Sequence, residues 1–452
     1  MKQRLTEGNV GSSLVKLTIP MIWGVFAIIA FNLVDTYFVG QLGTKPLAAM
    51  SFTFPVVMTL GSLSMGLGVG ASSVISRAIG EGDRQRVKKF TTNSLTLAVT
   101  AVVIFVIIGL LTIDPLFTAL GATADILPLV RDYMQIWYVG MVFLVVPMVG
   151  NSAIRASGNT VTPSFIMIFA AAVNIALDPL LILGIGVFPR MELQGAALAT
   201  VISRGTTLIA ALFVLHFKEK MLYLKLPTIR DTLWCWKDIL YVGLPAAASN
   251  MINPISIGVV TSLLAGFGAE AVAAFGVASR IESFALIAVM ALSSSIAPFV
   301  GQNWGAKKYA RVGKALQLSF VFCLFWGLMA AAVLAVTAPT LIAFFNPNPD
   351  IVAIASQYLW IVPISYAGAG IIYVASSAFN ALGKPIPSVI MTVARMFVLY
   401  IPLAYFGGQL YGVNGIFGAA CISNFIVGIG AYLWNQKTRS AKAVDNAEVV
   451  SN

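Results

Sequence analysis

The sequence predicts an all-α polytopic membrane protein with twelve transmembrane helices in two six-helix lobes, related by pseudo-two-fold symmetry about the membrane normal. Composition gives the class, because 59% of the 452 residues are hydrophobic and only 10% are charged. A soluble protein has about 25% charged residues. Apolar runs of about 20 residues, the length that crosses a hydrocarbon core, recur along the whole chain. An internal repeat indicates the two lobes.

Twelve apolar runs predict the spans. Their approximate bounds are 14–39, 46–74, 89–112, 127–152, 161–185, 193–216, 238–265, 271–298, 312–337, 351–378, 386–407 and 412–434. Lysine and arginine gather in alternate loops, after the second, sixth and eighth spans, and near both ends of the chain. Because such loops face the cytoplasm, we expect a multi-pass protein of the inner membrane with both termini cytoplasmic. The net charge of +11 comes mostly from these loops, so no nucleic-acid partner is expected.

The two halves of the chain resemble each other. GQLGTKPLAAMSF (Gly40–Phe52) pairs with AGFGAEAVAAFGV (Ala265–Val277), and the basic loops holding Gly80 and Gly305 keep the same shift of 225 residues. LQGAALATVISR pairs with VNGIFGAACISN at a shift of 220. Each half therefore has six spans of the same topology, with a cleft expected between the halves near the midplane. The predicted domains are an N-lobe at 1–220, a cytoplasmic linker at 221–237, a C-lobe at 238–440 and a flexible tail at 441–452.

Few ionisable residues lie inside the predicted spans, where such residues usually mark a pathway or a pair. They include Asp35, Asp178, Arg204, Arg280, Glu282 and Arg395. Counting about 1.5 Å of helix per residue, Asp35, Asp178 and Thr200 lie roughly 6–11 Å below the outer surface. Asn174 is one helical turn deeper than Asp178, on the same face. Three helices of the first half thus bring two carboxylates, an amide and a hydroxyl to similar depth.

The acidic cluster belongs to one half only. At the repeat shift Val260 stands opposite Asp35, and the partner of ALDPL in the fifth span is YIPLA, which has no carboxylate. Two buried carboxylates that share a site cannot both ionise cheaply. The pair is therefore expected to hold a proton or a Na+ ion. The oxygen ligands for Na+ would come from Asp35, Asn174, Asp178 and Thr200.

Other chemistries find little support in the sequence. His216 is the only histidine, and Cys235, Cys323 and Cys421 share no metal-binding spacing, so neither a structural metal site nor a cofactor is expected. The chain has no HExxH motif and no serine nucleophile with a partner histidine, which predicts that it is not an enzyme. A passive channel would not need a titratable pair in one lobe.

The remaining intramembrane charges allow two interpretations. Arg280, Glu282 and Arg395 lie near the midplane of the second half. They form either a buried ion pair that joins the eighth and eleventh spans or a contact to substrate. Arg204, one turn from Thr200, is placed to balance the acidic cluster of the first half.

Pro20 marks a hinge in the first span. Proline removes a backbone donor and clashes with the preceding turn, so it is a natural kink site. Asp35 follows fifteen residues later, roughly 22 Å along the helix, and a bend at Pro20 would displace it. We expect straight and bent states that depend on the charge of Asp35. Pro245, the repeat mate of Pro20, has no matching acid.

Together the motifs resemble the multidrug and toxic compound extrusion (MATE) family, in its DinF-type branch. The marks are P-x14-D-T-Y-F-V-G with LAAMSF after it, RAIGEGD, AIRASGN, NIALDPLLI and GAALAT. The resemblance implies the MATE fold and export of cationic or amphipathic drugs in exchange for H+ or Na+. The positions that it gives to the ion site and its neighbours are Asp35, Asn174, Asp178, Thr200, Tyr37 and Asn151. The acidic residues that the NorM-type branch uses in spans 7 and 10 are absent here.

These features predict an antiporter driven by H+, with Na+ as the alternative ion, that exports small-molecule drugs by alternating access. It is expected to work as a monomer in the lipid bilayer. Two other interpretations stay open. The loop RAIGEGDRQRVKK partly matches the signature of major-facilitator carriers, although the leucine and second glycine of that pattern are missing. A lipid or polysaccharide flippase of the same superfamily would share the two-lobed fold.

Overall fold

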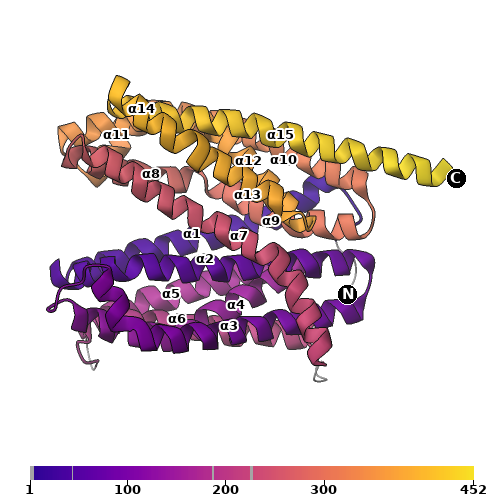
Figure 1. Cartoon of the computed structure of the whole chain (residues 1–452), viewed down its shortest axis with the longest axis horizontal. Helices are drawn as coiled ribbons and strands as arrows, with labels where there is room; N and C mark the ends of the chain where they lie inside the picture. The colour runs from indigo at the N-terminus through magenta and orange to yellow at the C-terminus, as the bar shows by residue number, and fades with distance from the viewer. Residues whose placement is uncertain (1–4, 43, 186–187, 224–227, 452) are drawn as a thin grey trace. The chain divides into compact units, whose positions relative to one another are not determined.

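The structure, a computed structural model, describes residues 5–42, 44–185, 188–223 and 228–451. Every regular element in these residues is a helix (Figure 1). Eleven helices or continuous helical runs are long and apolar enough to cross a membrane, and a pair bent by 49° makes a twelfth span. This confirms the predicted all-α polytopic class and its twelve spans.

Six spans of the first half follow the predicted order. They are α1 (Val10–Gly40), α2 (Thr44–Glu81), α3 (Arg84–Ala119), α4 (Leu127–Ala156), α5 (Val161–Leu183) and α6 (Glu192–Phe213), which continues into the π-helical η1 (Val214–Lys218). The second half begins with α7 (Ile229–Ala265), and its next span is broken at Leu286 into α8 (Ala269–Ala285) and α9 (Ile287–Gly305). The remaining elements are α10 (Tyr309–Phe345), α11 (Pro349–Ile361), η2 (Val362–Ser365), α12 (Tyr366–Ala381), α13 (Pro385–Val393), η3 (Ala394–Tyr400), α14 (Ile401–Tyr411) and α15 (Val413–Ser451).

The internal repeat is visible in where helices begin. Thr44 and Ala269 start α2 and α8, and Arg84 and Tyr309 start α3 and α10, in both cases 225 residues apart. The repeated motifs therefore mark a repeat of helices. Since α7 begins at Ile229, the predicted linker at 221–237 is helical over its second part. The predicted flexible tail at 441–452 lies outside the residues that the structure describes with their side chains.

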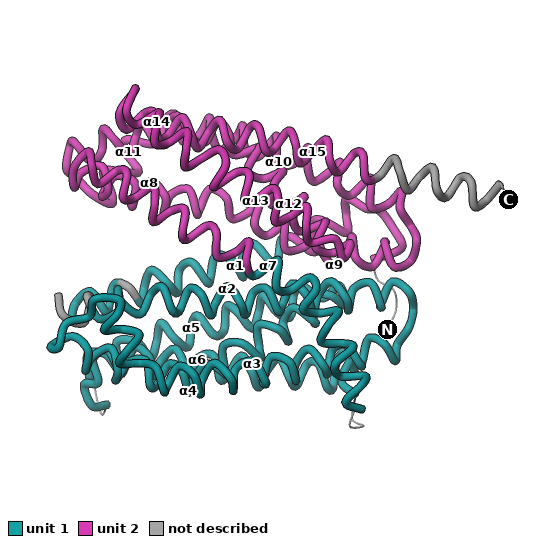
Figure 2. Tube along the Cα trace, viewed as in Figure 1, with its two compact units in different colours: residues 1–4, 19–247 teal, residues 5–18, 248–452 magenta. Residues whose placement is uncertain are grey.

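The chain forms two compact units, coloured separately in Figure 2. Unit 1 includes residues 19–247, and unit 2 includes residues 5–18 and 248–452. Unit 1 therefore contains the beginning of α7, the first span of the second half. Unit 2 contains the beginning of α1, the first span of the first half. Helix α1 passes from unit 2 into unit 1 beside Pro20, and α7 passes from unit 1 into unit 2 just after Pro245. The lobe boundaries that the sequence predicts, at 220 and 238, both fall inside unit 1.

Glycines in α2 explain why the beginning of α7 belongs to unit 1. A Cβ atom on Gly66 would lie 2.4 Å from the carbonyl oxygen of Gly243, and one on Gly70 would lie 2.3 Å from that of Ile239. Small residues let membrane helices approach this closely. The contact holds the first part of α7 against α2.

In each unit an arginine contacts the chain near the start of the helix that passes into the other unit. Arg311 of unit 2 donates hydrogen bonds to the carbonyl oxygens of Gly8 at 2.7 Å and Leu5 at 3.2 Å, just before α1. Its repeat mate in unit 1, Arg86, lies with its guanidinium 5.5 Å from the ring centre of Trp234, near the start of α7. The repeat has kept an arginine contact at the same place in both halves.

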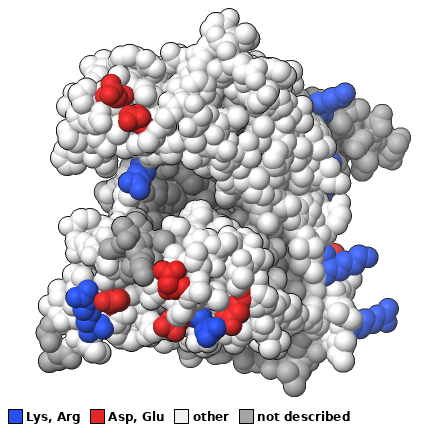
Figure 3. Space-filling model, turned by 60° about the vertical axis from the view of Figure 1, so that its left-hand side comes forward, with Lys and Arg blue, Asp and Glu red and all other residues white. Residues whose placement is uncertain are grey.

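Apolar side chains cover the outside of the helices. Along α3, Val103, Ile107 and Leu111 expose 50%, 55% and 77% of their surface, one helical turn apart. Such an exposed apolar stripe is expected where a helix contacts the hydrocarbon core of a bilayer. In Figure 3 the few charged side chains lie in the left half of the view and at its right edge, and the broad area between them is uncharged. The surface is that of a multi-pass membrane protein.

Candidate functional site

Helices α1 and α5 pack closely in unit 1. A Cβ atom on Gly24 would lie 3.2 Å from the Cα atom of Ser164, so the glycine lets the two backbones approach. Further along the same helices, Ala27, Phe31 and Ala171 form a small apolar cluster. These contacts fix the register between α1 and α5.

The next turn of each helix carries the candidate ion site. Asp35 is one turn beyond Phe31 on α1, and Asn174 and Asp178 are one and two turns beyond Ala171 on α5. Asn174 and Asp178 are fully buried, and the charge of Asp35 acts on Asp178. The structure thus brings together the two carboxylates and the amide that the depth argument places at one level.

These three side chains leave polar atoms without partners. Both carboxylate oxygens of Asp178, both side-chain polar atoms of Asn174 and Oδ1 of Asp35 have no hydrogen bond among the described residues. The Asn174 amide faces Asp178 across one helical turn but does not complete a hydrogen bond to it. Buried polar groups are nearly always paired, and leaving them unpaired is costly at low dielectric. The arrangement suits a bound ion, which is either a proton shared by the carboxylates or a cation coordinated by oxygens.

Helix α6 places a cation against α1, one turn before Asp35. The guanidinium of Arg204 lies 5.4 Å from the ring centre of Phe31 in α1. Among the described residues Arg204 forms no ion pair with Asp35 or Asp178. Thr200 is one turn before Arg204, and its carbonyl oxygen accepts a hydrogen bond from Ser203 at 2.9 Å. Arg204 therefore contacts α1 at Phe31, one turn before Asp35, and is not seen to balance the charge of either acid as the sequence predicted.

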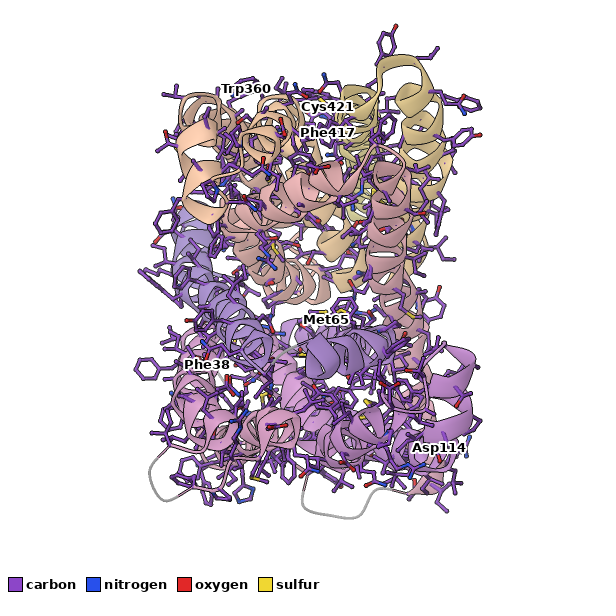
Figure 4. The ribbon with its side chains drawn as sticks, turned by 90° about the vertical axis from the view of Figure 1, so that its left-hand side faces the viewer. Phe38, Met65, Asp114, Trp360, Phe417 and Cys421 are labelled. Carbon is purple, nitrogen blue, oxygen red and sulfur yellow. The ribbon has the colours of Figure 1, made fainter. Side chains whose placement is uncertain are left out.

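Two predicted neighbours have different surroundings. Tyr37 exposes 65% of its surface and packs edge-on against Phe38, labelled in Figure 4. Asn151 of α4 is buried, and its Oδ1 has no partner among the described residues. Tyr133, also on α4, is buried and feels the charge of Asp35. The sequence argument missed Tyr133, because a single tyrosine in an apolar span gives no signal of its partners.

The predicted pairing of Glu282 with Arg395 in unit 2 is not a direct ion pair. Glu282 of α8 accepts a hydrogen bond from the hydroxyl of Tyr358 in α11. The ring of Tyr358 packs against Phe417, also labelled in Figure 4. Arg395 in η3 donates from Nη2 to Oδ1 of Asn253 at 3.0 Å. The charges of Glu282 and Arg395 act on each other only at longer range.

Comparison with known proteins identifies the family. The MatE family model matches residues 20–180 and 245–406, two stretches that begin at the repeat-related prolines and together cover more than half of the chain. A FAD transporter of Shewanella oneidensis is 40% identical over 97% of both chains. The multidrug export protein MepA of Staphylococcus haemolyticus is 25% identical over 98% of this chain and 97% of its own.

Solved structures share the fold over nearly the whole length. The MATE transporter VcmN of Vibrio cholerae in the bent form is 31% identical, with a TM-score of 0.90 and coverage of 96% of this chain and 98% of that one. A MATE in the straight conformation is 28% identical, with a TM-score of 0.90 and coverage of 98% and 99%. At these identities the chain is a relative of both proteins. It therefore belongs to the MatE family, whose members are multidrug and toxic compound extrusion transporters.

Proposed function

We propose that this chain is an ion-coupled exporter that uses Asp35 and Asp178 to exchange protons for small organic molecules. The observation that carries the proposal is the set of unpartnered polar atoms on Asp35, Asn174 and Asp178. A purely structural cluster would satisfy its oxygens inside the protein. A carrier must instead keep them free, so that an ion occupies them in one state and leaves in another.

A proton fits these residues directly. Protonated Asp178 can donate to Oδ1 of Asn174 or to Oδ1 of Asp35, so one proton removes one charge and completes one hydrogen bond. Na+ is the alternative coupling ion, because carboxylate, amide and hydroxyl oxygens suit hard cations. In that case Thr200 on α6 would add its hydroxyl to the oxygens of α1 and α5.

Alternating access would work through the hinge in α1. The helix runs without interruption through Pro20, and it changes unit beside this residue. A bend at Pro20 would move Asp35 relative to α5, and a neutral carboxyl can choose different partners from a charged one. Related proteins have been solved in a bent form and in a straight conformation, which supports two conformations for this fold.

Two substrate classes are candidates. Cationic or amphipathic drugs are suggested by the multidrug relatives and by the carboxylates of unit 1. A flavin nucleotide such as FAD is suggested by the 40% identity to a FAD transporter over 97% of both chains. Membership of the MatE family removes the major-facilitator alternative. The flippase alternative would require transport of a lipid or a lipid-linked sugar.

The proposal places the protein in the inner membrane as a monomer. Both termini would lie in the cytoplasm, because the basic loops and the basic ends of the chain then face the same side. No cofactor other than the coupling ion is needed for this activity.

Transport by the purified protein in lipid vesicles tests the proposed function. A proton gradient should drive transport of ethidium, a cationic probe, or of FAD, and a Na+ gradient alone should not. Movement under the Na+ gradient alone would replace H+ by Na+ as the coupling ion. If neither gradient moves either compound while labelled lipid is flipped, the flippase alternative replaces the exporter.

A further inference from the structure

The spans of unit 2 are interrupted inside the region that crosses the membrane. Leu286 separates α8 from α9, η2 is a 3-10 segment between α11 and α12, and η3 is a seven-residue π-helical segment between α13 and α14. Irregular backbone at membrane depth persists where protein or a binding site surrounds it. π-helical segments are frequent at functional sites. Arg395 lies in η3.

Arg395 has partners on two sides and, within the described part of the chain, a buried donor without a partner. The side chain is buried, with 6% of its surface exposed. Its Nη2 donates to Oδ1 of Asn253 in α7 at 3.0 Å, and its guanidinium lies 5.5 Å from the ring centre of Tyr373 in α12. Its Nε–H has no acceptor among the described residues. These contacts fix the plane of the guanidinium and leave the Nε–H without an acceptor in the residues that the structure describes.

The positive charge of Arg395 has no direct counter-ion. Glu282 is the acid whose charge it interacts with, but the carboxylate of Glu282 is bound by Tyr358. Among the residues that the structure describes, no acid forms an ion pair with Arg395. An unpaired charge inside a membrane protein is expensive. A bound anion would supply both the missing charge and the missing acceptor.

A second free donor belongs to the same cluster. Tyr366 of α12 is fully buried, and its hydroxyl has no partner among the described residues. Its charge interaction with Glu282 places it near the acid, and Tyr400 at the end of η3 interacts with both Glu282 and Arg395. The cluster therefore combines a guanidinium, a free hydroxyl and several aromatic rings, which suits an anionic aromatic molecule.

We propose that Arg395 binds the phosphate of an anionic aromatic substrate of the flavin nucleotide class. This inference rests on the proposed function and names its substrate contact in unit 2. A guanidinium presents its donors in a planar fork that matches phosphate oxygens. Asn253 and Tyr373 orient that fork before the substrate arrives, so little side-chain entropy is lost on binding. The flavin ring system contacts the aromatic side chains, and Arg395 distinguishes substrates that carry a phosphate from those that do not.

Flavin mononucleotide and riboflavin provide the test, because they share one ring system and differ by the phosphate. Their affinities for the purified full-length protein in detergent are measured by quenching of flavin fluorescence. The wild type should bind flavin mononucleotide roughly tenfold to hundredfold more tightly than riboflavin, the usual effect of hydrogen bonds to a charged group. Arg395→Gln should lose this preference and leave the affinity for riboflavin unchanged. Lys314→Gln, which removes the same charge from an exposed position of α10, should keep it.

Equal affinities of the wild type for the two flavins would overturn the proposal, and so would an unchanged preference in Arg395→Gln. Asn253→Ala provides a second variant in case Arg395→Gln does not fold. It removes the residue that orients the guanidinium and should weaken flavin mononucleotide binding without affecting riboflavin.

Vesicle transport separates this inference from the proposed function. Proton-driven transport of ethidium by Arg395→Gln should not be slower than wild-type transport, because ethidium carries no phosphate and the variant removes a charge of the same sign. Loss of ethidium transport in this variant, with wild-type transport intact, would contradict a role confined to phosphate. Failure of the wild type to transport anything under a proton gradient would instead count against the proposed function.

Discussion

The two halves share one helical repeat, yet only the first has carboxylates at the positions of Asp35 and Asp178. Asp35 and Asp178 stand inside continuous helices of unit 1. At a shift of 225 residues from Asp35 and Asp178, the second half has Val260, which is fully buried in an apolar cluster, and Leu403, which packs against that cluster. The fold can therefore be built without these carboxylates. Their presence in one half indicates a task other than packing.

The second half places a cation where the first has none. Arg395 corresponds by the repeat shift to Ala170 of α5, which is buried among apolar residues. The backbone differs in the same way, since α5 is an unbroken helix and the related span contains η3. A shared fold does not decide which residues carry chemistry. The comparison suggests one half for the ion and the other for the substrate.

Asp35→Asn should have the largest effect on ion coupling by the first half. The amide keeps the shape of the carboxyl but cannot gain or lose a proton. Proton-driven export in vesicles should fall by roughly 5- to 150-fold, the range of typical coupling energies, while the protein still folds and binds substrate. Val260→Ala, at the repeat-related position, should retain coupling. Wild-type transport by Asp35→Asn would show that the acid is dispensable.

The same variant should remove the pH dependence of substrate binding. In the wild type, protonation of the pair is expected to favour the releasing state, so the dissociation constant should rise as the pH falls. In Asp35→Asn it should stay constant from alkaline to acidic buffer. Equilibrium binding of ethidium across this range measures the effect. A pH dependence equal to that of the wild type would place the sensing group elsewhere.

Asp178→Leu introduces into unit 1 the residue that the second half has at this place. Export should fall, by no more than in Asp35→Asn. Stability should rise by about 1–3 kcal/mol, because that is the usual cost of a buried polar group without hydrogen-bond partners. Thermal unfolding in detergent, followed together with vesicle transport, measures both changes. A lower melting temperature would mean that the carboxylate serves the fold.

Gly66→Ala tests the packing that places the beginning of α7 in unit 1. The added methyl would meet the backbone of Gly243 at 2.4 Å, so we expect a loss of about 1–3 kcal/mol from overpacking. Gly61→Ala on the same helix is the matched control, because its Cβ would have nothing within 4 Å. Thermal unfolding should separate the two variants, and equal melting temperatures would argue against the close helix contact.

The smallest expected effect is a change of distance. Spin labels on the outer parts of α1 and α2 should report a shorter or longer separation when the buffer is changed from alkaline to acidic, as α1 bends at Pro20. Labels placed beyond Pro245 on α7 and on α8 should show no such change, because that helix carries no matching acid. A distance distribution that ignores pH in both pairs would leave Pro20 as a fixed kink.

The sequence predicts the helices well because the bilayer sets their length and the basic loops mark one side. It does not reveal the interruptions at Leu286, η2 and η3, which depend on tertiary contacts and leave no period in the apolar pattern. The sequence also does not predict that the first part of α7 belongs to unit 1 and the first part of α1 to unit 2. A signal is present in the small residues Gly66 and Gly70 of α2 facing Gly243 of α7, but only the structure shows that they meet.

The candidate site was predicted in part. Depth along the helices places Asp35 and Asp178 at one level, and the packing of α1 on α5 gives them a common location. Tyr37 does not share that face, since a residue two positions from Asp35 points about 200° away around the helix. The separation of Glu282 from Arg395 could not be predicted, because it depends on Tyr358 reaching the carboxylate across two helices.

Proton release on substrate binding tests most directly the claim that coupling belongs to the first half. Purified protein in weakly buffered detergent is mixed with ethidium or FAD, and a pH-sensitive dye or electrode counts the protons. The wild type should release protons, Asp35→Asn and Asp178→Leu should release none, and Glu282→Gln should release as many as the wild type. Release that persists in both first-half variants, or that disappears in Glu282→Gln, would contradict the account.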